Sequence, residues 1–419
     1  MTSFKLSSTF SPRTATGSIK QLNWFYFFAI TLLALFSIVH FLRVGYLLAA
    51  HWSAWSIGDW AINFQAGLTR RGLSGEIFIF LTKLTGASLN WVVFTVQCIA
   101  YISYMGLFLF LLRKKKVTFW YFVACFSPGF LLFNYYDGIS VGRKEILLYL
   151  AFMLWLYFAE YRQESRVRTI VFSICYFFLT LIHEVFFFYA PYFCVATSLY
   201  KSRWCPNLSW LIPASATFAI LMTLVLSRPL DSAGVCNSLI QIGAAATVCD
   251  GPINFGTQST AALTYDFFNN FGQRSLLALS FGILVVLLPA HLILRDIDTA
   301  GRLQRSWSLA LIALLGFSLP LFILAADWGR WVSTHVTLSL FMLLIALKPK
   351  LATIDEPPSV PSLSWLPIKS KVLSLSLALI CFMVFNLSYS FNHCCTNDLL
   401  KPLGPVNRIL NTSLFKLNH

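Results

Sequence analysis

Long apolar runs separated by short polar segments dominate the sequence. A helix needs about 20 predominantly apolar residues to cross the hydrocarbon core of a bilayer. The runs are continuous rather than alternating, which favours helices over the strands of a β-barrel. A further apolar stretch at 74–86 is short and predicts a re-entrant or interfacial helix. The pattern predicts about 11 membrane-spanning helices, at residues 22–42, 88–112, 117–135, 146–160, 169–183, 185–200, 209–227, 275–294, 306–326, 331–347 and 372–390.

The expected fold is therefore an all-α polytopic membrane protein. We divide it into a cytoplasmic N-terminal tail (1–21), a transmembrane domain (22–390) and an outer-face C-terminal tail (391–419). The first apolar run lacks a small-residue cleavage site, so we interpret it as a spanning helix rather than a signal peptide. Two of the predicted outer loops are longer than the others, at 43–73 and 228–274.

Composition narrows the class of protein. Of the 419 residues, 58% are hydrophobic and 11% are charged, and the mean hydropathy is +0.71. Soluble domains are nearer a quarter charged, and a single water-soluble core of this size could not bury so much apolar surface. These values exclude a soluble enzyme, a disordered chain and a nucleic-acid-binding domain, although the net charge is +15.

The basic residues indicate membrane topology. With the N-terminus in the cytoplasm, 19 of the 31 Lys and Arg lie on the inner side, as the positive-inside rule expects. One kinked helix over 169–200 is the alternative to two short ones, and it would invert every later loop. The two-helix interpretation keeps the later basic loops inside and places His183 and Glu184 at an outer hairpin tip. We expect a multi-pass protein of the plasma (inner) membrane with its C-terminus outside.

Ionisable residues gather at the helix ends that are predicted to face outside. Charges at membrane depth are energetically costly, so they often mark a substrate or ion pathway. Because four separate stretches bring such residues to the same leaflet, we expect them to meet in one pocket that opens to the outside. The candidates are Asp59, Arg70, Arg71, Asp137, Arg143, Lys144, Glu145, His183, Glu184, Asp327 and Arg330.

The cations among these candidates suit an anionic ligand. Arg70 and Arg71 lie in a glycine-containing stretch, and guanidinium groups bind phosphate oxygens in a bidentate manner. Interfacial snorkelling of the two side chains is the alternative. Arg143 and Lys144 open a predicted helix, where cations are locally unfavourable. They require an anionic partner, either Asp137 or a bound phosphate, and a salt-bridged helix start is the alternative.

His183 and Glu184 suit general acid–base chemistry. A histidine satisfied inside the core is the alternative. The sequence has neither an H-E-x-x-H pattern nor a spaced set of His and Cys ligands, so we expect no metal and no cofactor. Asp327 and Arg330 lie at i and i+3, a spacing that favours either an ion pair or a shared role in substrate binding.

Residues 128–195 resemble the bacterial polysaccharide polymerases of the Wzy/EpsG type. The corresponding features are an Arg-led helix start at 142–145, a short basic turn at 162–168, and a returning helix that ends at 181–184 ahead of Pro191. The wider layout resembles the membrane glycosyltransferases of the GT-C class, which carry an acidic residue in the first outer loop. Asp59 occupies that position here.

The resemblance implies a reaction on polyprenyl-diphosphate-linked sugars at the outer face of the membrane. Its expected partners are the lipid-linked oligosaccharide, membrane lipids and other polysaccharide-assembly proteins, without nucleic acid. The base that activates the acceptor hydroxyl would be Asp59, Glu145 or Glu184, with His183 assisting. The expected substrate-binding residues are Arg70, Arg71, Asp137, Arg143, Lys144, Asp327 and Arg330.

Two other functions remain open. One is a secondary transporter or flippase for a lipid-linked or anionic substrate, and the other is a non-catalytic subunit of a polysaccharide assembly complex. Transporters place charges near the midplane in paired halves, whereas this sequence has no evident internal symmetry and its charges gather at one interface. The outer loop 228–274 is expected to close over the site, and its Cys236 and Cys249 form a candidate disulfide.

Overall fold

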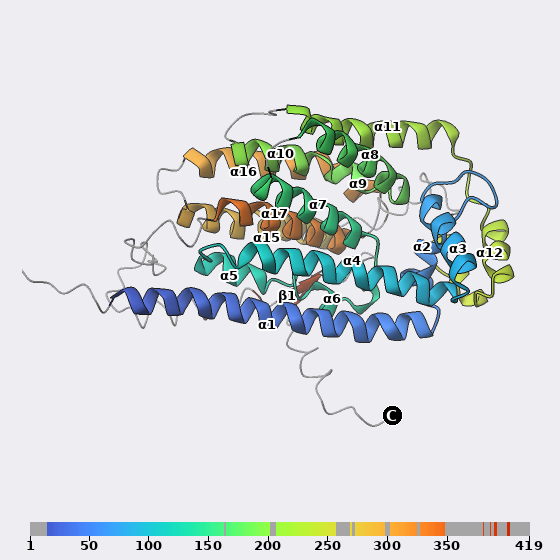
Figure 1. Ribbon diagram of the computed structural model, residues 1–419, viewed down its shortest axis with the longest axis horizontal. Helices are drawn as coiled ribbons and strands as arrows, with labels where there is room; N and C mark the ends of the chain where they lie inside the picture. Colours follow the sequence, from blue (N-terminus) through green and yellow to red (C-terminus); the bar gives the residue numbers. More distant parts are fainter. Residues whose placement is uncertain are drawn as a thin grey trace, which may run out of the picture.

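The computed structural model describes residues 15–162, 165–201, 207–256, 273–297, 302–324 and 327–347, together with residues 269, 380, 386, 389–391 and 400–402. Most of the helices lie roughly parallel along the long axis of the molecule (Figure 1). The longer ones are α1 (Ala15–Ala50), α3 (Gly72–Thr85), α4 (Leu89–Leu112), α7 (Glu145–Tyr161), α8 (Arg166–Ile182), α10 (Pro191–Lys201), α11 (Leu211–Leu226), α12 (Ser232–Gln241), α15 (Gln273–Ile297), α16 (Arg302–Leu324) and α17 (Trp328–Ala346).

Short elements connect these helices. They are the π-helical turn η1 (Ala54–Gly58), α2 (Asp59–Ala61), α5 (Phe119–Cys125), α6 (Phe133–Tyr136), the 3-10 turn η2 (Gly138–Ser140), α9 (Phe186–Tyr189), the 3-10 turns η3 (Asn207–Trp210) and η4 (Ala246–Cys249), and α13 (Pro252–Phe255). Strands β1 (Tyr389–Phe391) and β2 (Leu400–Pro402) form one short antiparallel pair. The described part of the chain is otherwise helical, as the sequence predicts.

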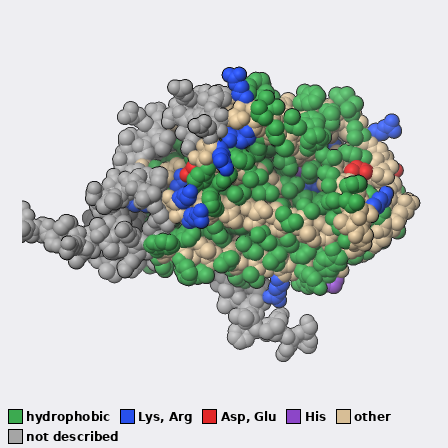
Figure 2. Space-filling model, viewed as in Figure 1, with side chains coloured by type: hydrophobic (Ala, Val, Ile, Leu, Met, Phe, Trp, Pro, Cys, Tyr) green, Lys and Arg blue, Asp and Glu red, His purple; other side chains and the backbone are tan. Residues whose placement is uncertain are grey.

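Five described helices are long and apolar enough to cross a membrane. They are Trp24–Ala50, Leu89–Leu112, Leu208–Leu226, Ser306–Ile323 and Trp328–Ala346. Large apolar side chains such as Phe28, Phe218 and Leu309 are about 60% exposed on these helices, and Figure 2 shows one face of the molecule covered largely by apolar side chains. A surface of this kind suits contact with lipid rather than with water. The protein is membrane-embedded.

The prediction of about 11 spans is not confirmed. Helices α7 and α8 coincide with predicted spans, but each has only 17 residues. At 1.5 Å per residue they are about 25 Å long, which is the lower limit for crossing a bilayer. The last predicted span, at 372–390, lies almost wholly outside the described residues.

Two predicted spans are interrupted. The stretch 117–135 divides into α5 and α6, because Pro128 has no backbone N–H and disfavours helical backbone in the residue before it. The stretch 185–200 divides into α9 and α10, and Pro191 is the first residue of α10, a position at which proline is favoured. The apolar length of each stretch predicted a single span, because hydropathy does not detect breaks in the helical backbone.

Helix α17 is the most enclosed element of the bundle. Every residue from Trp328 to Leu344 is buried, and the helix contacts α4, α7, α10, α15 and α16. Its buried polar side chains form two faces. Thr334 accepts or donates a 3.1 Å hydrogen bond with the hydroxyl of Tyr149 on α7. On the other face, His335 Nδ1 lies 2.8 Å from the hydroxyl of Tyr192 on α10.

Segments 53–71 and 228–256 pack against each other at the end of the bundle that carries α3 and α12 (Figure 1). We call these two segments the loop end. The Arg228 N–H donates a 2.7 Å hydrogen bond to the Leu68 carbonyl, and other bonds join the segments nearby. A disulfide between Cys236 and Cys249, whose Cα atoms are 5.8 Å apart, closes part of the second segment. The two longer predicted loops therefore share one end of the molecule.

Candidate functional site

Nine of the candidate residues meet where the loop end packs on the helix ends, and we call them the charge cluster. Its members are Asp59, Arg71, Arg143, Lys144, Glu145, His183, Glu184, Asp327 and Arg330. They come from five distant segments, namely the starts of α2, α3 and α7, the turn after α8, and the residues that open α17. With His183 neutral, four carboxylates face four cations, so the formal charges of the cluster cancel.

Backbone contacts at Gly142 fix the start of α7 against the loop end. Trp60 Nε1 donates a 2.6 Å hydrogen bond to the Gly142 carbonyl, and Gln97 Nε2 donates a second of 2.8 Å to the same oxygen. Gly142 has φ of +77°, and a Cβ there would lie 2.9 Å from the Gln97 amide. The position therefore requires glycine. Trp60 is adjacent to Asp59, so the same bond holds Asp59 beside Arg143.

Arg71 joins the loop end to the turn after α8. Its Nε and Nη2 atoms donate hydrogen bonds of 2.6–2.9 Å to the Glu184 carboxylate, and its Nη1 lies 3.7 Å from Asp59 Oδ1. Arg71 has φ of +65° as the residue that precedes α3, a backbone conformation that is uncommon outside glycine. Burial opposes the charge of Arg71, but the Glu184 carboxylate more than offsets burial and raises its pKa.

Arg330 binds two carboxylates at the other side of the cluster. Its guanidinium donates to Glu145 from one nitrogen and to Asp327 from another. The Arg330 and Glu145 side chains are only 4% and 7% exposed. Arg143 lies 3.8 Å from the same Asp327 carboxylate, and it donates a 3.0 Å hydrogen bond to the Trp55 carbonyl. Asp327 therefore links two guanidinium groups.

His183 lies between two carboxylates. Its Nε2 is 3.9 Å from Glu145, and its Nδ1 is 3.7 Å from Glu184. The residue has extended backbone directly after α8, which turns its ring into the cluster. Burial and the charge of Arg71 lower the pKa of His183, so the ring is neutral near pH 7. A neutral imidazole between two carboxylates is able to pass a proton from one to the other.

Asp59 is the least satisfied member of the cluster. Its side chain is 1% exposed, and neither carboxylate oxygen has a hydrogen-bond partner in the structure. Burial opposes its charge, but the cations of Lys144, Arg143 and Arg71 hold its pKa well below the usual range. A buried carboxylate without donors is costly, and a catalytic role is one explanation for such an exception. The Asp59 carboxylate is therefore ionised, and both of its oxygens can accept a hydrogen bond from a ligand.

Lys144 faces Asp59 and is fully buried. Its ammonium donates a 3.1 Å hydrogen bond to the Ile182 carbonyl, at the C-terminal end of α8. That end carries partial negative charge, which favours a cation. Burial nevertheless lowers the pKa of Lys144 to about 8. A substantial part of its population is therefore neutral only slightly above physiological pH.

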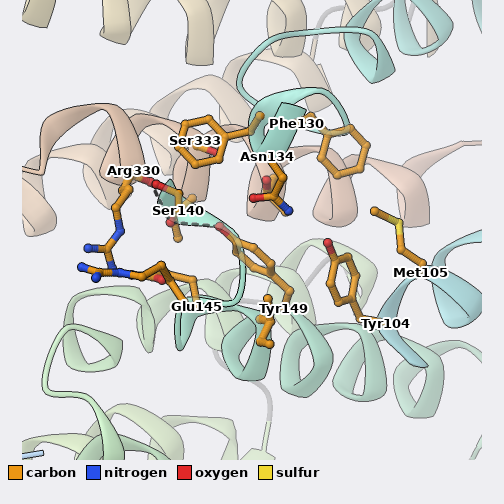
Figure 3. Close-up of a pocket in the computed structure, with 14 residues that line it drawn as sticks. Tyr104, Met105, Phe130, Asn134, Ser140, Glu145, Tyr149, Arg330 and Ser333 are labelled. Carbon is orange, nitrogen blue, oxygen red and sulfur yellow. Dashed lines mark hydrogen bonds and ion pairs between the residues drawn. The ribbon is translucent and has the colours of Figure 1, made fainter. Parts of the chain in front are cut away.

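A pocket extends from the charge cluster into the helical bundle. Its empty volume is about 480 Å³, which includes the part that is open to solvent. Glu145 and Arg330 lie toward one side of it, and Tyr104 and Met105 lie toward the other (Figure 3). The remaining wall residues are Phe130, Phe133, Asn134, Ser140, Arg143, Ile146, Tyr149, Ser333, Thr334 and Thr337. Beyond the three charged residues the walls are aromatic, hydroxyl-bearing or amide-bearing, apart from the apolar Met105 and Ile146.

Two candidates stand apart from the charge cluster. Arg70 is exposed and forms no ion pair with the cluster among the described residues. Asp137 is buried, and it accepts a 2.9 Å hydrogen bond from the Ser140 hydroxyl. The sequence offered Asp137 or a bound phosphate as the anionic partner of Arg143, and the structure places the Asp327 carboxylate 3.8 Å from it. Asp137 is close in sequence, but Asp327 is brought there by the packing of α17 on α7.

The uncharged pocket residues were not predicted. Ser333, Thr334 and Thr337 follow Arg330 at helical spacing of three, four and seven residues, so they share one face of α17. That periodicity was the available signal. Tyr104 and Tyr149 offered none, because aromatic residues are frequent in every apolar run of this chain.

Among the described residues, no three His, Cys, Asp or Glu side chains form a group that would hold a metal ion. Comparison with protein-family models, with curated proteins and with solved structures finds no match to the chain. Its function is therefore inferred from the geometry of the site.

Proposed function

We propose that the protein is an integral membrane glycosyltransferase of the polysaccharide-polymerase type, acting on polyprenyl-diphosphate-linked sugars at the outer face of the plasma membrane. One observation carries the proposal: a buried cluster of carboxylates and cations borders a pocket with hydroxyl-bearing and aromatic walls. Such charges are costly inside a membrane protein and are retained chiefly where they act on a substrate. The resemblance of residues 128–195 to Wzy/EpsG-type polymerases points in the same direction.

The chemistry of glycosyl transfer matches these groups. A carboxylate takes the proton of the acceptor hydroxyl, whose oxygen forms a bond to C1 of the donor sugar. The bond between C1 and the diphosphate oxygen breaks, and its electron pair leaves with the polyprenyl diphosphate. Cations stabilise the charge that develops on the leaving group. The proton then passes from the carboxylate to solvent, which completes the cycle without a cofactor.

The three candidate bases differ in their surroundings. Glu184 is held by three hydrogen bonds from Arg71, which reduces its capacity to accept a proton. Glu145 accepts a hydrogen bond from Arg330, but it is the carboxylate that lines the pocket, and for that reason we assign it as the base. Asp59 has no donor of its own, and His183 lies 3.9 Å from Glu145. We assign His183 to proton relay and Asp59 to holding the neighbouring cations.

The cations also differ in how much of their charge is engaged. Arg71 and Arg330 each bind carboxylates directly. Lys144 donates a hydrogen bond to a backbone carbonyl. Arg143 donates to the Trp55 carbonyl and lies 3.8 Å from Asp327. We assign the diphosphate to Lys144 and Arg143. Arg70, which is exposed, is assigned to the approaching substrate rather than to the buried cluster.

The disulfide supports placement of the loop end outside. Disulfides persist in oxidising compartments and are rare in the reducing cytosol. Cys236 and Cys249 are bonded in the structure, and they lie in the segment that packs beside Asp59. A cytoplasmic N-terminus at the opposite end of α1 is the matching orientation, which agrees with the distribution of basic residues in the sequence.

A transporter or flippase is the second candidate. The polar face of α17 favours it, because Thr334 and Thr337 continue the polar character of Arg330 into the bundle. A polar row inside a membrane protein is a feature of transport pathways. The two functions differ in one measurable respect, since a flippase moves the labelled lipid-linked sugar across proteoliposomes without forming a glycosidic bond.

The direct test is chain extension by purified protein in nanodiscs supplied with lipid-linked oligosaccharide from its own host. Glu145→Gln is expected to lower the rate by 100-fold or more, about the worth of a general base. Lys115→Met is the matched control, because it breaks a buried 2.7 Å ion pair with Glu160 elsewhere in the bundle. Substrate flux without transfer by wild type supports the flippase. Unchanged chain length in cells that carry Glu145→Gln or Arg143→Ala at normal protein levels supports a non-catalytic subunit.

A further inference from the structure

We propose that the pocket beside Glu145 is the subsite for an uncharged, hydroxyl-bearing sugar ring of the acceptor. The inference rests on the proposed function and adds to it the chemical class of ligand that occupies this space. The pocket walls come from α4, α6, α7 and α17 and from the turns between them. No feature of the sequence predicted that these elements share a cavity.

The distribution of charge in the pocket wall excludes a phosphate from the uncharged part of the pocket. Arg143, Glu145 and Arg330 are the charged residues of the lining, and Glu145 and Arg330 pair with each other. The rest of the lining carries no formal charge. A phosphate seated among the uncharged residues would be left without a cation, which is strongly unfavourable in a buried site. The phosphates of a donor therefore lie at the charge cluster, outside the uncharged part of the pocket.

The lining is mainly apolar, but its polar groups favour a ligand that bears hydroxyl groups over a lipid chain. An apolar tail needs an apolar groove, but hydroxyl groups of Ser333, Thr337 and Tyr149 and the amide of Asn134 are among the lining groups. Polar groups inside a membrane-embedded bundle are unfavourable unless they make hydrogen bonds. The wall hydroxyls have partners in the bundle, since Ser333 donates a 2.9 Å hydrogen bond to the Gly129 carbonyl and Tyr149 lies 3.1 Å from Thr334. A ligand with many hydroxyl groups adds to these bonds, because each wall hydroxyl keeps acceptor capacity.

The aromatic residues complete the match. Tyr104 and Tyr149 pack edge to face with ring centroids 5.7 Å apart, and Phe130 and Phe133 belong to the same wall. A sugar ring presents C–H groups on its faces and hydroxyl groups at its edges. Aromatic surfaces beside hydroxyl and amide groups are therefore complementary to both parts of such a ring.

The pocket would hold a sugar ring directly beside Glu145, the proposed base. Glu145 opens α7 and Tyr149 follows it by one turn, so both side chains reach the pocket from the same face of one helix. Figure 3 shows Tyr149 between the Glu145–Arg330 pair and Tyr104. A ring held beside Tyr149 has one edge next to the Glu145 carboxylate. The hydroxyl on that edge is the one that loses its proton.

The test uses two variants in the pocket and two matched controls. Thr337→Val and Tyr149→Phe each remove one pocket hydroxyl with little change of volume. Ser339→Ala and Tyr192→Phe remove buried hydroxyls that bond to each other at 3.3 Å on the opposite face of α17. Initial rates of chain extension are measured in nanodiscs over a range of lipid-linked oligosaccharide extracted from the host. Native mass spectrometry of each variant measures retention of the same oligosaccharide without turnover.

Each pocket variant is expected to raise KM about tenfold, the worth of one buried hydrogen bond, with kcat changed by less than about threefold. The two controls are expected to leave KM unchanged. Equal KM values for pocket variants and controls, with wild-type transfer intact, overturn the subsite and leave the proposed function standing. Retention of the saccharide by wild type but not by Thr337→Val, without any transfer, supports the subsite and overturns the transferase. Neither retention nor transfer by wild type overturns both.

Discussion

The ion pair between Arg330 and Glu145 provides a quantitative test of how the charge cluster is held. Both side chains are almost fully buried, at 4% and 7% exposure. Replacing one partner of a buried pair leaves the other charge uncompensated, at a cost of about 3–5 kcal/mol. We expect Arg330→Met and Glu145→Leu each to lower the free energy of unfolding by that amount. Arg330→Met also leaves Asp327 with Arg143 as its remaining partner, 3.8 Å away.

The double variant separates pairing from simple loss of packing. With both charges removed, no uncompensated charge stays buried, so Arg330→Met with Glu145→Leu is expected to be at least as stable as either single variant. Unfolding free energies are measured by denaturant titration in mixed micelles, with tryptophan fluorescence as the signal. Two single losses below about 1 kcal/mol, or a double loss equal to their sum, refute the buried pair.

Three further predictions concern the surroundings of the pair. The proposed role of Lys144 needs the ammonium, whose pKa is about 8, so the transfer rate falls as the pH rises through 8, and Lys144→Met lacks that pH limb. Gly58→Ala places a Cβ 2.3 Å from the carbonyl oxygen of Val248 and is expected to lower the transfer rate at least tenfold. Gly106→Ala is the control, because nothing lies within 4 Å of its Cβ, and it should leave the transfer rate unchanged. Equal transfer rates for the two variants would show that the loop end does not position Asp59. Reduction of the disulfide in wild type is expected to lower the free energy of unfolding by about 3 kcal/mol, measured by the same titration, and reductant should have no effect on a variant with serine at both bonded cysteines.

The sequence predicted those features that depend on local properties. Apolar length located most of the helices, because burial of a backbone in lipid demands a continuous apolar segment. The gathering of charged residues at helix ends followed from the same argument, since Arg71, Lys144 and His183 all flank apolar runs. Their meeting in space was inferred from topology, and the ion pairs agree with it.

Features that depend on packing between distant helices could not be predicted from the sequence. The sequence offered Asp137 or a bound phosphate as the partner of Arg143, and it did not indicate Asp327, which the structure places 3.8 Å from Arg143. That choice depends on how α17 rests on α7, which no local pattern encodes. The pocket was missed for the same reason, because Tyr104 and Tyr149 become neighbours only when α4 packs on α7.

The balance of charge inside the cluster has a consequence for how substrate arrives. Equal numbers of positive and negative groups at close quarters produce a field that decays steeply with distance, so the site exerts little long-range pull on an anion in solution. Enzymes with a one-sided charge gain speed by electrostatic steering and lose it as ionic strength rises. Under the proposed function, the lipid-linked substrate reaches the charge cluster by lateral diffusion within the bilayer, and the cluster itself should add little salt dependence to the association rate.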